Sequence, residues 1–180
     1  MSNWNKVFKP IVVLCVICVV ITGALAATNS VTPPIIAEAT RLAQEQARAE
    51  LLPEADSFEK VENVAVENVS DVYAATNGAG YVITSTAKGY GGTMTVMVAY
   101  TPDGTIKQIK VTEQGETQGI GSKVAGTASY WERYQGQPAA ELKINKDGGT
   151  IDAESGATIS SRALAKAVSS ANEAYNAVNS

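Results

Sequence analysis

An uncharged apolar run over residues 11–27 constrains this chain more than any other feature, because a stretch of this kind belongs in a membrane. It reads IVVLCVICVVITGALAA and contains no Asp, Glu, Lys or Arg. Together with its neighbours it approaches the roughly 20 residues that cross a bilayer as a helix. We therefore predict one transmembrane helix over residues 10–30.

The charges on the two sides of this run predict its orientation. Lys6 and Lys9 precede the run, whereas every acidic residue and all the other basic residues follow it. By the positive-inside rule, residues 1–9 form a cytoplasmic tail and the body is extracytoplasmic, anchored in the inner or plasma membrane. A cleaved signal peptide is the alternative, because residues 24–26 (Ala-Leu-Ala) match a cleavage site. The run exceeds the roughly 7 to 15 residues of a signal h-region, so we favour an uncleaved anchor.

The composition excludes several kinds of chemistry. The 180 residues include no His, 14 Lys and Arg, and 18 Asp and Glu, which gives a formal net charge of −4. Without His, Ser-His-Asp hydrolysis and His-ligated zinc or haem are unavailable within the chain. The acidic balance argues against nucleic acid as a partner. We predict neither a catalytic side chain nor a metal site, and we expect a bound cofactor to carry any chemistry.

The rest of the chain has the pattern of an α+β domain, an antiparallel sheet packed with helices. Residues 29–34 predict a turn-rich exit from the membrane, and residues 35–52 predict a helix that ends at Pro53. We assign residues 31–55 to a juxtamembrane helix and linker, and residues 56–180 to the extracytoplasmic domain. Its β-rich runs predict strands at 61–69, 71–75, 80–87, 93–100, 106–112 and 142–144. Its helices are predicted at 121–134 and 160–178, the latter with one apolar face.

A small, hydroxyl-rich segment, DAESGATIS, occupies residues 152–160, directly before the last predicted helix. Its Ser and Thr residues fit two interpretations. They can cap the helix by accepting hydrogen bonds from its free N–H groups. Alternatively, the same helix N-terminus can bind a phosphate, with Arg162 one turn into the helix.

This segment resembles the flavinylation motif of the FMN-binding domain family, in which an Asp, two variable residues, Ser or Thr, Gly, Ala and then Thr or Ser accept covalent FMN. The resemblance places Asp152 at the acidic position and the acceptor hydroxyl at Thr158. It implies that a separate flavin transferase, using FAD, makes a phosphoester to Thr158. The residues implied to surround the phosphate are Ser155, Gly156, Ala157, Ser160, Ser161 and Arg162.

Two glycine-containing segments further upstream resemble other parts of the same family. Residues 89–92 read GYGG, and residues 113–121 read EQGETQGIG. As local structure alone, these glycines indicate turns at strand ends. They also resemble the family's GYGG strand entry and its Glu-Thr-Pro-Gly-Leu-Gly loop against the flavin ring, with Gln118 here in place of Pro. The residues implied to contact FMN are Tyr90, Gly91, Gly92, Glu116, Thr117, Gly119, Ile120 and Lys123.

The order of these features, an N-terminal anchor, the glycine segments and a terminal SGAT helix, resembles the G-type subunit of Rnf electron-transport complexes. The resemblance implies an electron relay through covalent FMN, in a complex that couples ferredoxin:NAD oxidoreduction to sodium or proton translocation. It also implies other membrane and redox subunits as partners, besides the flavin transferase and membrane lipid. Three alternatives stay open: a stand-alone flavin carrier, the C-type subunit of the sodium-pumping NADH:quinone reductase, and a non-redox binding module in which residues 155–161 only cap a helix.

Overall fold

The computed structural model describes residues 8–180, and the chain divides into two units, residues 1–43 and residues 44–180. The predicted cytoplasmic tail falls almost wholly outside the described residues. The apolar part of the first unit, Lys9–Ser30, is helical, with a mean hydropathy of 2.8 and no buried side chains. It is long and apolar enough to cross a membrane.

Helix α1, Lys9–Leu51, runs without interruption through the segment predicted as a turn-rich exit. That prediction, for residues 29–34, was wrong, because Pro33 and Pro34 lie inside the helix. Each proline removes one helical N–H donor without ending the helix. Ser and Thr hydroxyls in this stretch bond back to helix carbonyls rather than to a turn. These bonds join Thr28 to Ala24 at 2.9 Å, Ser30 to Ala27 at 2.7 Å and Thr32 to Thr28 at 2.6 Å.

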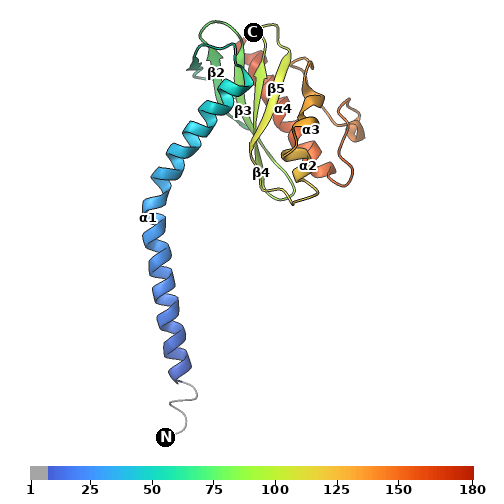
Figure 1. Cartoon of the computed structure of the whole chain (residues 1–180). Coiled ribbons are helices and arrows are strands. Elements are labelled where there is room, and N and C mark those ends of the chain that lie inside the picture. Colours follow the sequence, from blue (N-terminus) through green and yellow to red (C-terminus); the bar gives the residue numbers. More distant parts are fainter. Residues whose placement is uncertain (1–7) are drawn as a thin grey trace. The chain divides into compact units, whose positions relative to one another are not determined.

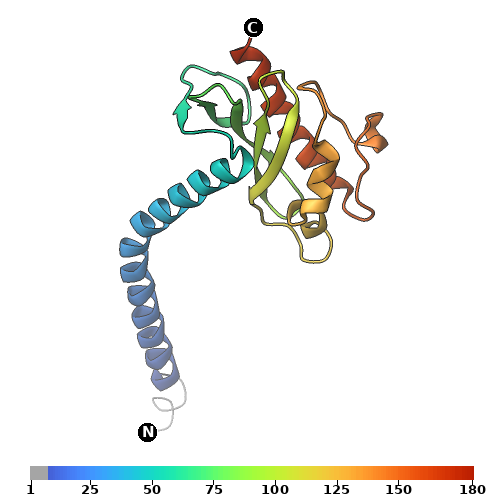
Figure 2. The ribbon, with the colours of Figure 1, turned by 45° about the horizontal axis from the view of Figure 1, so that its top comes forward.

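The second unit contains a five-stranded antiparallel sheet in which every strand pairs with its neighbour along the chain. Its strands are β1 Phe58–Lys60, β2 Val69–Ala75, β3 Tyr81–Lys88, β4 Thr93–Tyr100 and β5 Ile106–Glu113. Helix α4, Thr158–Val178, crosses one face of this sheet (Figures 1 and 2) and contacts β2, β3 and β4. The predicted α+β class is therefore confirmed.

The strand predicted over residues 61–69 was wrong. This stretch is mostly a loop, and β2 begins only at Val69. Asn63 and Asn68 have positive φ values of 66° and 64°. Asn tolerates this left-handed conformation, which interrupts an extended backbone. The valines that suggested a strand pack against the core from the loop, half-buried.

The single helix predicted over residues 121–134 is replaced by three short ones, α2 Ser122–Ala125, α3 Ala128–Trp131 and η2 Glu132–Tyr134. The first ends at Ala125, with Gly126 as its C-cap, because Thr127 is extended, with φ −122° and ψ 113°. The strand predicted at 142–144 was also wrong. Ile144 makes an isolated bridge to Ile151, and a 3₁₀ turn, η3 Asn145–Asp147, follows it.

The core surrounds β4, which is buried on both faces. Toward α4, the side chains are Met94, Val96, Val98 and Tyr100, which share one face because side chains alternate along a strand. Toward the end of α1, Met97 and Ala99 pack with Leu51 and Leu52. Full burial of one such Leu side chain contributes about 1.5 to 3 kcal/mol. Both layers hold the sheet, and thereby the loops at its ends, in a fixed place.

Candidate functional site

A cleft of about 540 Å³ opens where the N-terminus of α4 meets three loops. We call it the cleft; its lining residues are Tyr90, Glu116, Thr117, Ile120, Gly121, Lys146, Gly156, Ala157, Thr158, Ile159 and Ser160. Its volume lies within the range of small-molecule and cofactor sites. The cleft brings together the hydroxyl-rich segment and the two glycine-containing segments, although they are far apart in the sequence.

A buried carboxylate, Glu116, joins these segments at the base of the cleft. Its Oε1 accepts the N–H of Gly91 at 3.2 Å, and its Oε2 accepts the hydroxyl of Ser160 at 2.6 Å. Glu116 is only 7% exposed. A buried carboxylate is costly unless its oxygens are hydrogen-bonded, and here both have donors. Glu116 therefore links the GYGG loop to the first turn of α4.

Two glycines leave the space that this carboxylate occupies. A Cβ on Gly89 would lie 2.0 Å from Glu116 Oε1, and a Cβ on Gly121 would lie 2.2 Å from Glu116 Oε2. Both distances are shorter than any side chain permits. Gly91 also has no room for a side chain, since an added Cβ would lie 2.1 Å from the carbonyl oxygen of Gly115. The glycine-rich segments are thus required for close approach and not only for turns.

The attachment residue suggested by the sequence, Thr158, is the first residue of α4 and is half-buried. Its Oγ1 accepts a hydrogen bond from Lys146 Nζ at 3.0 Å. Ala157 occupies the N-cap position, and no side chain caps it. Ser161 instead accepts the N–H of Glu154 at 3.0 Å. The capping interpretation of Thr158 is therefore wrong, and its hydroxyl faces the cleft.

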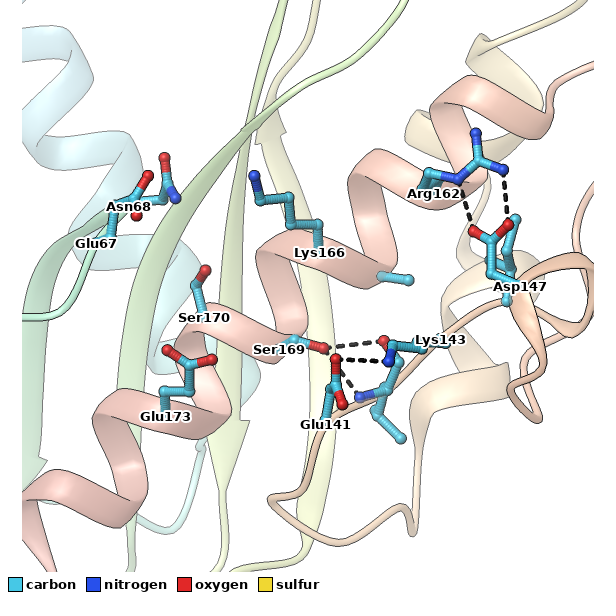
Figure 3. Close-up of a pocket in the computed structure, with 13 residues that line it drawn as sticks. Glu67, Asn68, Glu141, Lys143, Asp147, Arg162, Lys166, Ser169, Ser170 and Glu173 are labelled. Carbon is cyan, nitrogen blue, oxygen red and sulfur yellow. Dashed lines mark hydrogen bonds and ion pairs between the residues drawn. The ribbon is translucent and has the colours of Figure 1, made fainter.

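A second concavity, of about 450 Å³, lies along α4 and carries mainly charged side chains (Figure 3). We call it the charged groove; its charged residues are Glu67, Glu141, Lys143, Asp147, Arg162, Lys166 and Glu173. Arg162, which the sequence suggested as a phosphate ligand, lies here and forms a two-point ion pair with Asp147, at 2.6 and 2.7 Å. The hydrogen bonds from Arg162 hold the pKa of the Asp147 carboxyl below its usual value.

The other suggested site residues divide by position. Tyr90, Glu116, Thr117, Ile120, Gly156, Ala157, Thr158 and Ser160 line the cleft. Gly91, Gly92, Gly119, Lys123, Ser155, Ser161 and Arg162 do not line it. Lys146 also lines the cleft but was not predicted from the sequence, because it has no motif around it and lies 12 residues before Thr158. Among residues 8–180, no group of three or more His, Cys, Asp or Glu residues could hold a metal ion.

Comparison with known proteins agrees with this geometry. The FMN-binding domain family matches residues 89–173, which span the cleft, and the RnfG N-terminal region matches residues 1–51. The fold and the cleft thus define a protein of the FMN-binding domain class. Within that class, the chain belongs to the RnfG family, the G-type subunits of Rnf-type ion-translocating oxidoreductase complexes.

Two relatives carry this assignment. The G-type subunit of the proton-translocating ferredoxin:NAD(+) oxidoreductase complex of Clostridium ljungdahlii is 32% identical over 178 residues, covering 96% of this chain and 93% of the relative. The Na(+)-translocating counterpart from Acetobacterium woodii is 32% identical over 195 residues, with the same coverage. A solved structure, the C-type subunit of the Na(+)-translocating NADH-quinone reductase from Parabacteroides distasonis, shares the fold, with a TM-score of 0.50, 20% identity and 60% coverage of each chain.

Proposed function

We propose that this chain relays electrons through an FMN esterified to Thr158, as the membrane-anchored G-type subunit of an Rnf-type complex. The names of its relatives describe ferredoxin:NAD(+) oxidoreductases that translocate protons or Na⁺, so the proposed partners are the other membrane and redox subunits of such a complex. The flavin supplies the electron-transfer chemistry, and the protein holds and surrounds it.

The contact between Thr158 and Lys146 is the observation that carries this proposal. A hydroxyl at the mouth of a cofactor-sized cleft, half-buried and without a capping role, has an ammonium group 3.0 Å from its oxygen. That arrangement suits a hydroxyl that carries a phosphoryl group, because a phosphodiester keeps one negative charge near the same oxygen.

The rim of the cleft fits the rest of an FMN molecule. Tyr90, Ile120 and Ile159 line it and are 71%, 52% and 49% exposed. Exposed apolar side chains around one cleft mark a binding surface, here one that suits a planar aromatic ring system. The buried Glu116 and the glycines packed against it give this surface a rigid base.

Attachment of the flavin by a flavin transferase would be a phosphoryl transfer. A bond would form between Thr158 Oγ1 and the phosphorus of the FMN half of FAD, the pyrophosphate bond would break, AMP would leave and the hydroxyl would lose its proton. Gly156 and Ala157, the two residues before Thr158, are small, so neither places a bulky side chain beside the hydroxyl.

Replacement of Thr158 tests the proposal directly. Thr158→Val keeps the shape of the side chain without the nucleophile, so we expect no covalent flavin, whereas Thr158→Ser keeps some attachment. Thr150→Val, at an exposed threonine ahead of the motif, serves as a control that retains the flavin. In-gel flavin fluorescence, peptide mass mapping and circular dichroism are measured together. Covalent FMN on a folded Thr158→Val chain, or none on wild type made with an active transferase, would contradict the proposal.

The proposed topology has residues 1–9 in the cytoplasm, one membrane span over residues 10–30, a juxtamembrane helix and linker over residues 31–55 and an extracytoplasmic FMN-binding domain over residues 56–180. The support is the apolar stretch of α1 and the lysines that precede it. A protease added outside intact cells or spheroplasts is expected to digest the domain while a tag at Met1 stays protected. A protected domain would contradict the orientation.

A further inference from the structure

The loop over residues 141–149 brings Lys146 to the cleft, and the residue before that lysine is fastened to the attachment segment. Asn145 Nδ2 donates to Asp152 Oδ1 at 3.0 Å, and Asn145 Oδ1 accepts the N–H of Ala153 at 3.3 Å. One amide side chain thus contacts both a side chain and the backbone at the start of the motif. These bonds fix the distance between the loop and the motif just before Thr158.

The residue after the lysine is fastened to α4. The carboxylate of Asp147 accepts from Arg162 Nε and Nη2 at 2.6 and 2.7 Å, as the dashed lines in Figure 3 show. A two-point contact between planar groups fixes orientation as well as distance. The guanidinium group of Arg162 is therefore already paired with a carboxylate in the charged groove. Adjacent residues, Lys146 and Asp147, therefore face different concavities.

The backbone of the loop is closed by its own hydrogen bonds. Asn145 N–H bonds to Ile151 O at 2.8 Å, and Gly149 N–H bonds to Ile144 O at 3.0 Å. Gly148 has φ +83°, and a Cβ on Gly149 would lie 2.0 Å from the carbonyl oxygen of Lys143. The loop thus depends on two adjacent glycines and holds a defined conformation around Lys146.

We propose that Lys146 is the cation that binds the phosphoester carried by Thr158, and that Asn145 and Asp147 position it there. This inference rests on the proposed function. In the structure Nζ contacts a neutral hydroxyl oxygen, which is a weak partner for an ammonium group. Esterification places charged, non-bridging oxygens two bonds from that same atom, and charge-assisted bonds to them are stronger. Lys146 is exposed, so its charge stays solvated before the flavin is attached.

The test compares the full chain, purified without flavin, as wild type, Lys146→Met, Lys146→Arg and Lys143→Met. Lys143 lies on the same loop but lines the charged groove, so its replacement removes the same charge away from the cleft. Covalent flavin is followed by in-gel fluorescence during incubation with transferase, FAD and Mg²⁺. Loss of one charge-assisted bond predicts attachment about tenfold slower in Lys146→Met. Lys146→Arg and Lys143→Met are expected to load at the wild-type rate.

Phosphorus NMR of the loaded proteins separates phosphate binding from recognition by the transferase. We expect the resonance of the attached phosphodiester to shift in Lys146→Met and to shift less in Asp147→Asn, which keeps the lysine but weakens its anchor. Lys143→Met leaves the resonance unchanged. If Lys146→Met takes up no flavin, the phosphorus resonance of loaded Asp147→Asn is compared with that of the loaded wild type instead.

An unchanged phosphorus resonance in the loaded variant overturns the inference even where attachment is slow, because Lys146 would then serve only the transferase. An equal shift in Lys143→Met overturns it as well, since the effect would not be specific to the cleft. A wild-type chain that takes up no flavin contradicts the proposed function itself. Failure of the inference about Lys146 can therefore be distinguished from failure of the proposed function.

Discussion

The cleft and the charged groove both border α4 and the loop over residues 141–149, yet their polar groups differ in exposure to solvent. In the cleft the polar base is buried, and Glu116 and Ser160 satisfy each other. In the groove the ion pair of Asp147 and Arg162 is on the surface, in contact with solvent. Buried polar groups are costly to leave without partners, whereas exposed ones turn to water. Loss of a buried, hydrogen-bonded group in the cleft should therefore matter, and loss of an exposed charge in the groove should hardly matter at all.

Removal of one carboxylate from each concavity should give the largest contrast. Glu116→Ala leaves the hydroxyl of Ser160 and the N–H of Gly91 without their acceptor, and we expect a loss of about 3 kcal/mol in the free energy of unfolding. Glu173→Ala, at an exposed position in the groove, should change it by less than about 0.5 kcal/mol. Urea unfolding of the detergent-solubilised chain, followed by circular dichroism, measures both. Equal losses would end the distinction between the two concavities.

A pair of glycine replacements tests whether the base of the cleft is closely packed. A methyl group on Gly121 meets Glu116 and the hydroxyl of Ser160, so Gly121→Ala should cost about 2 kcal/mol and reduce flavin attachment. Gly92→Ala is the matched control, because the nearest atom to its added Cβ would be 3.7 Å away. The same unfolding measurement and in-gel fluorescence apply. If Gly121→Ala is as stable as Gly92→Ala and carries as much flavin, the base of the cleft rearranges easily around an added methyl group.

Two serines of the groove, Ser169 and Ser170, are buried; the hydroxyl of Ser169 is also hydrogen-bonded and should behave as the cleft residues do. Ser169 Oγ accepts the N–H of Leu142 at 2.9 Å and donates to the Leu142 carbonyl at 2.9 Å. Ser169→Ala should cost about 1 kcal/mol and speed hydrogen exchange at the Leu142 amide. Ser170→Ala, on the same helix, is the comparison. No acceleration at Leu142 would mean that this bond does not hold the loop.

The smallest effect is expected from the surface ion pair, through its pH dependence. Arg162 lowers the pKa of Asp147, so the pair stabilises the folded chain above the unfolded pKa of about 3.9 and loses this contribution as the pH falls through the lower, folded value. Arg162→Met should raise the Asp147 titration midpoint, observed by NMR of its carboxyl carbon, with little change in stability at neutral pH. A midpoint that does not move would show that Arg162 is not the cause.

Elements with a strong local pattern could be predicted from the sequence. The apolar run gives a helix, and alternation along β4 and helical spacing along α4 identify the buried faces, because each pattern depends on neighbours within one or two turns. The predictions over residues 29–34 and 61–69 failed where short polar residues allow two conformations. Residues 29–34 stayed helical despite two prolines, and two Asn residues interrupted the strand expected over 61–69.

The amino-acid order alone established the membrane-length helix, the antiparallel meander and the motif around Thr158. Only the tertiary structure decided which charges meet that motif. Glu116 and Ser160 are 44 residues apart and Lys146 and Thr158 are 12 apart, with no periodicity that links either pair. Arg162, one turn beyond Thr158, turns instead toward Asp147 in the groove. Contacts of this kind depend on how loops close over a packed sheet, and that closure is set by the whole core rather than by neighbouring residues.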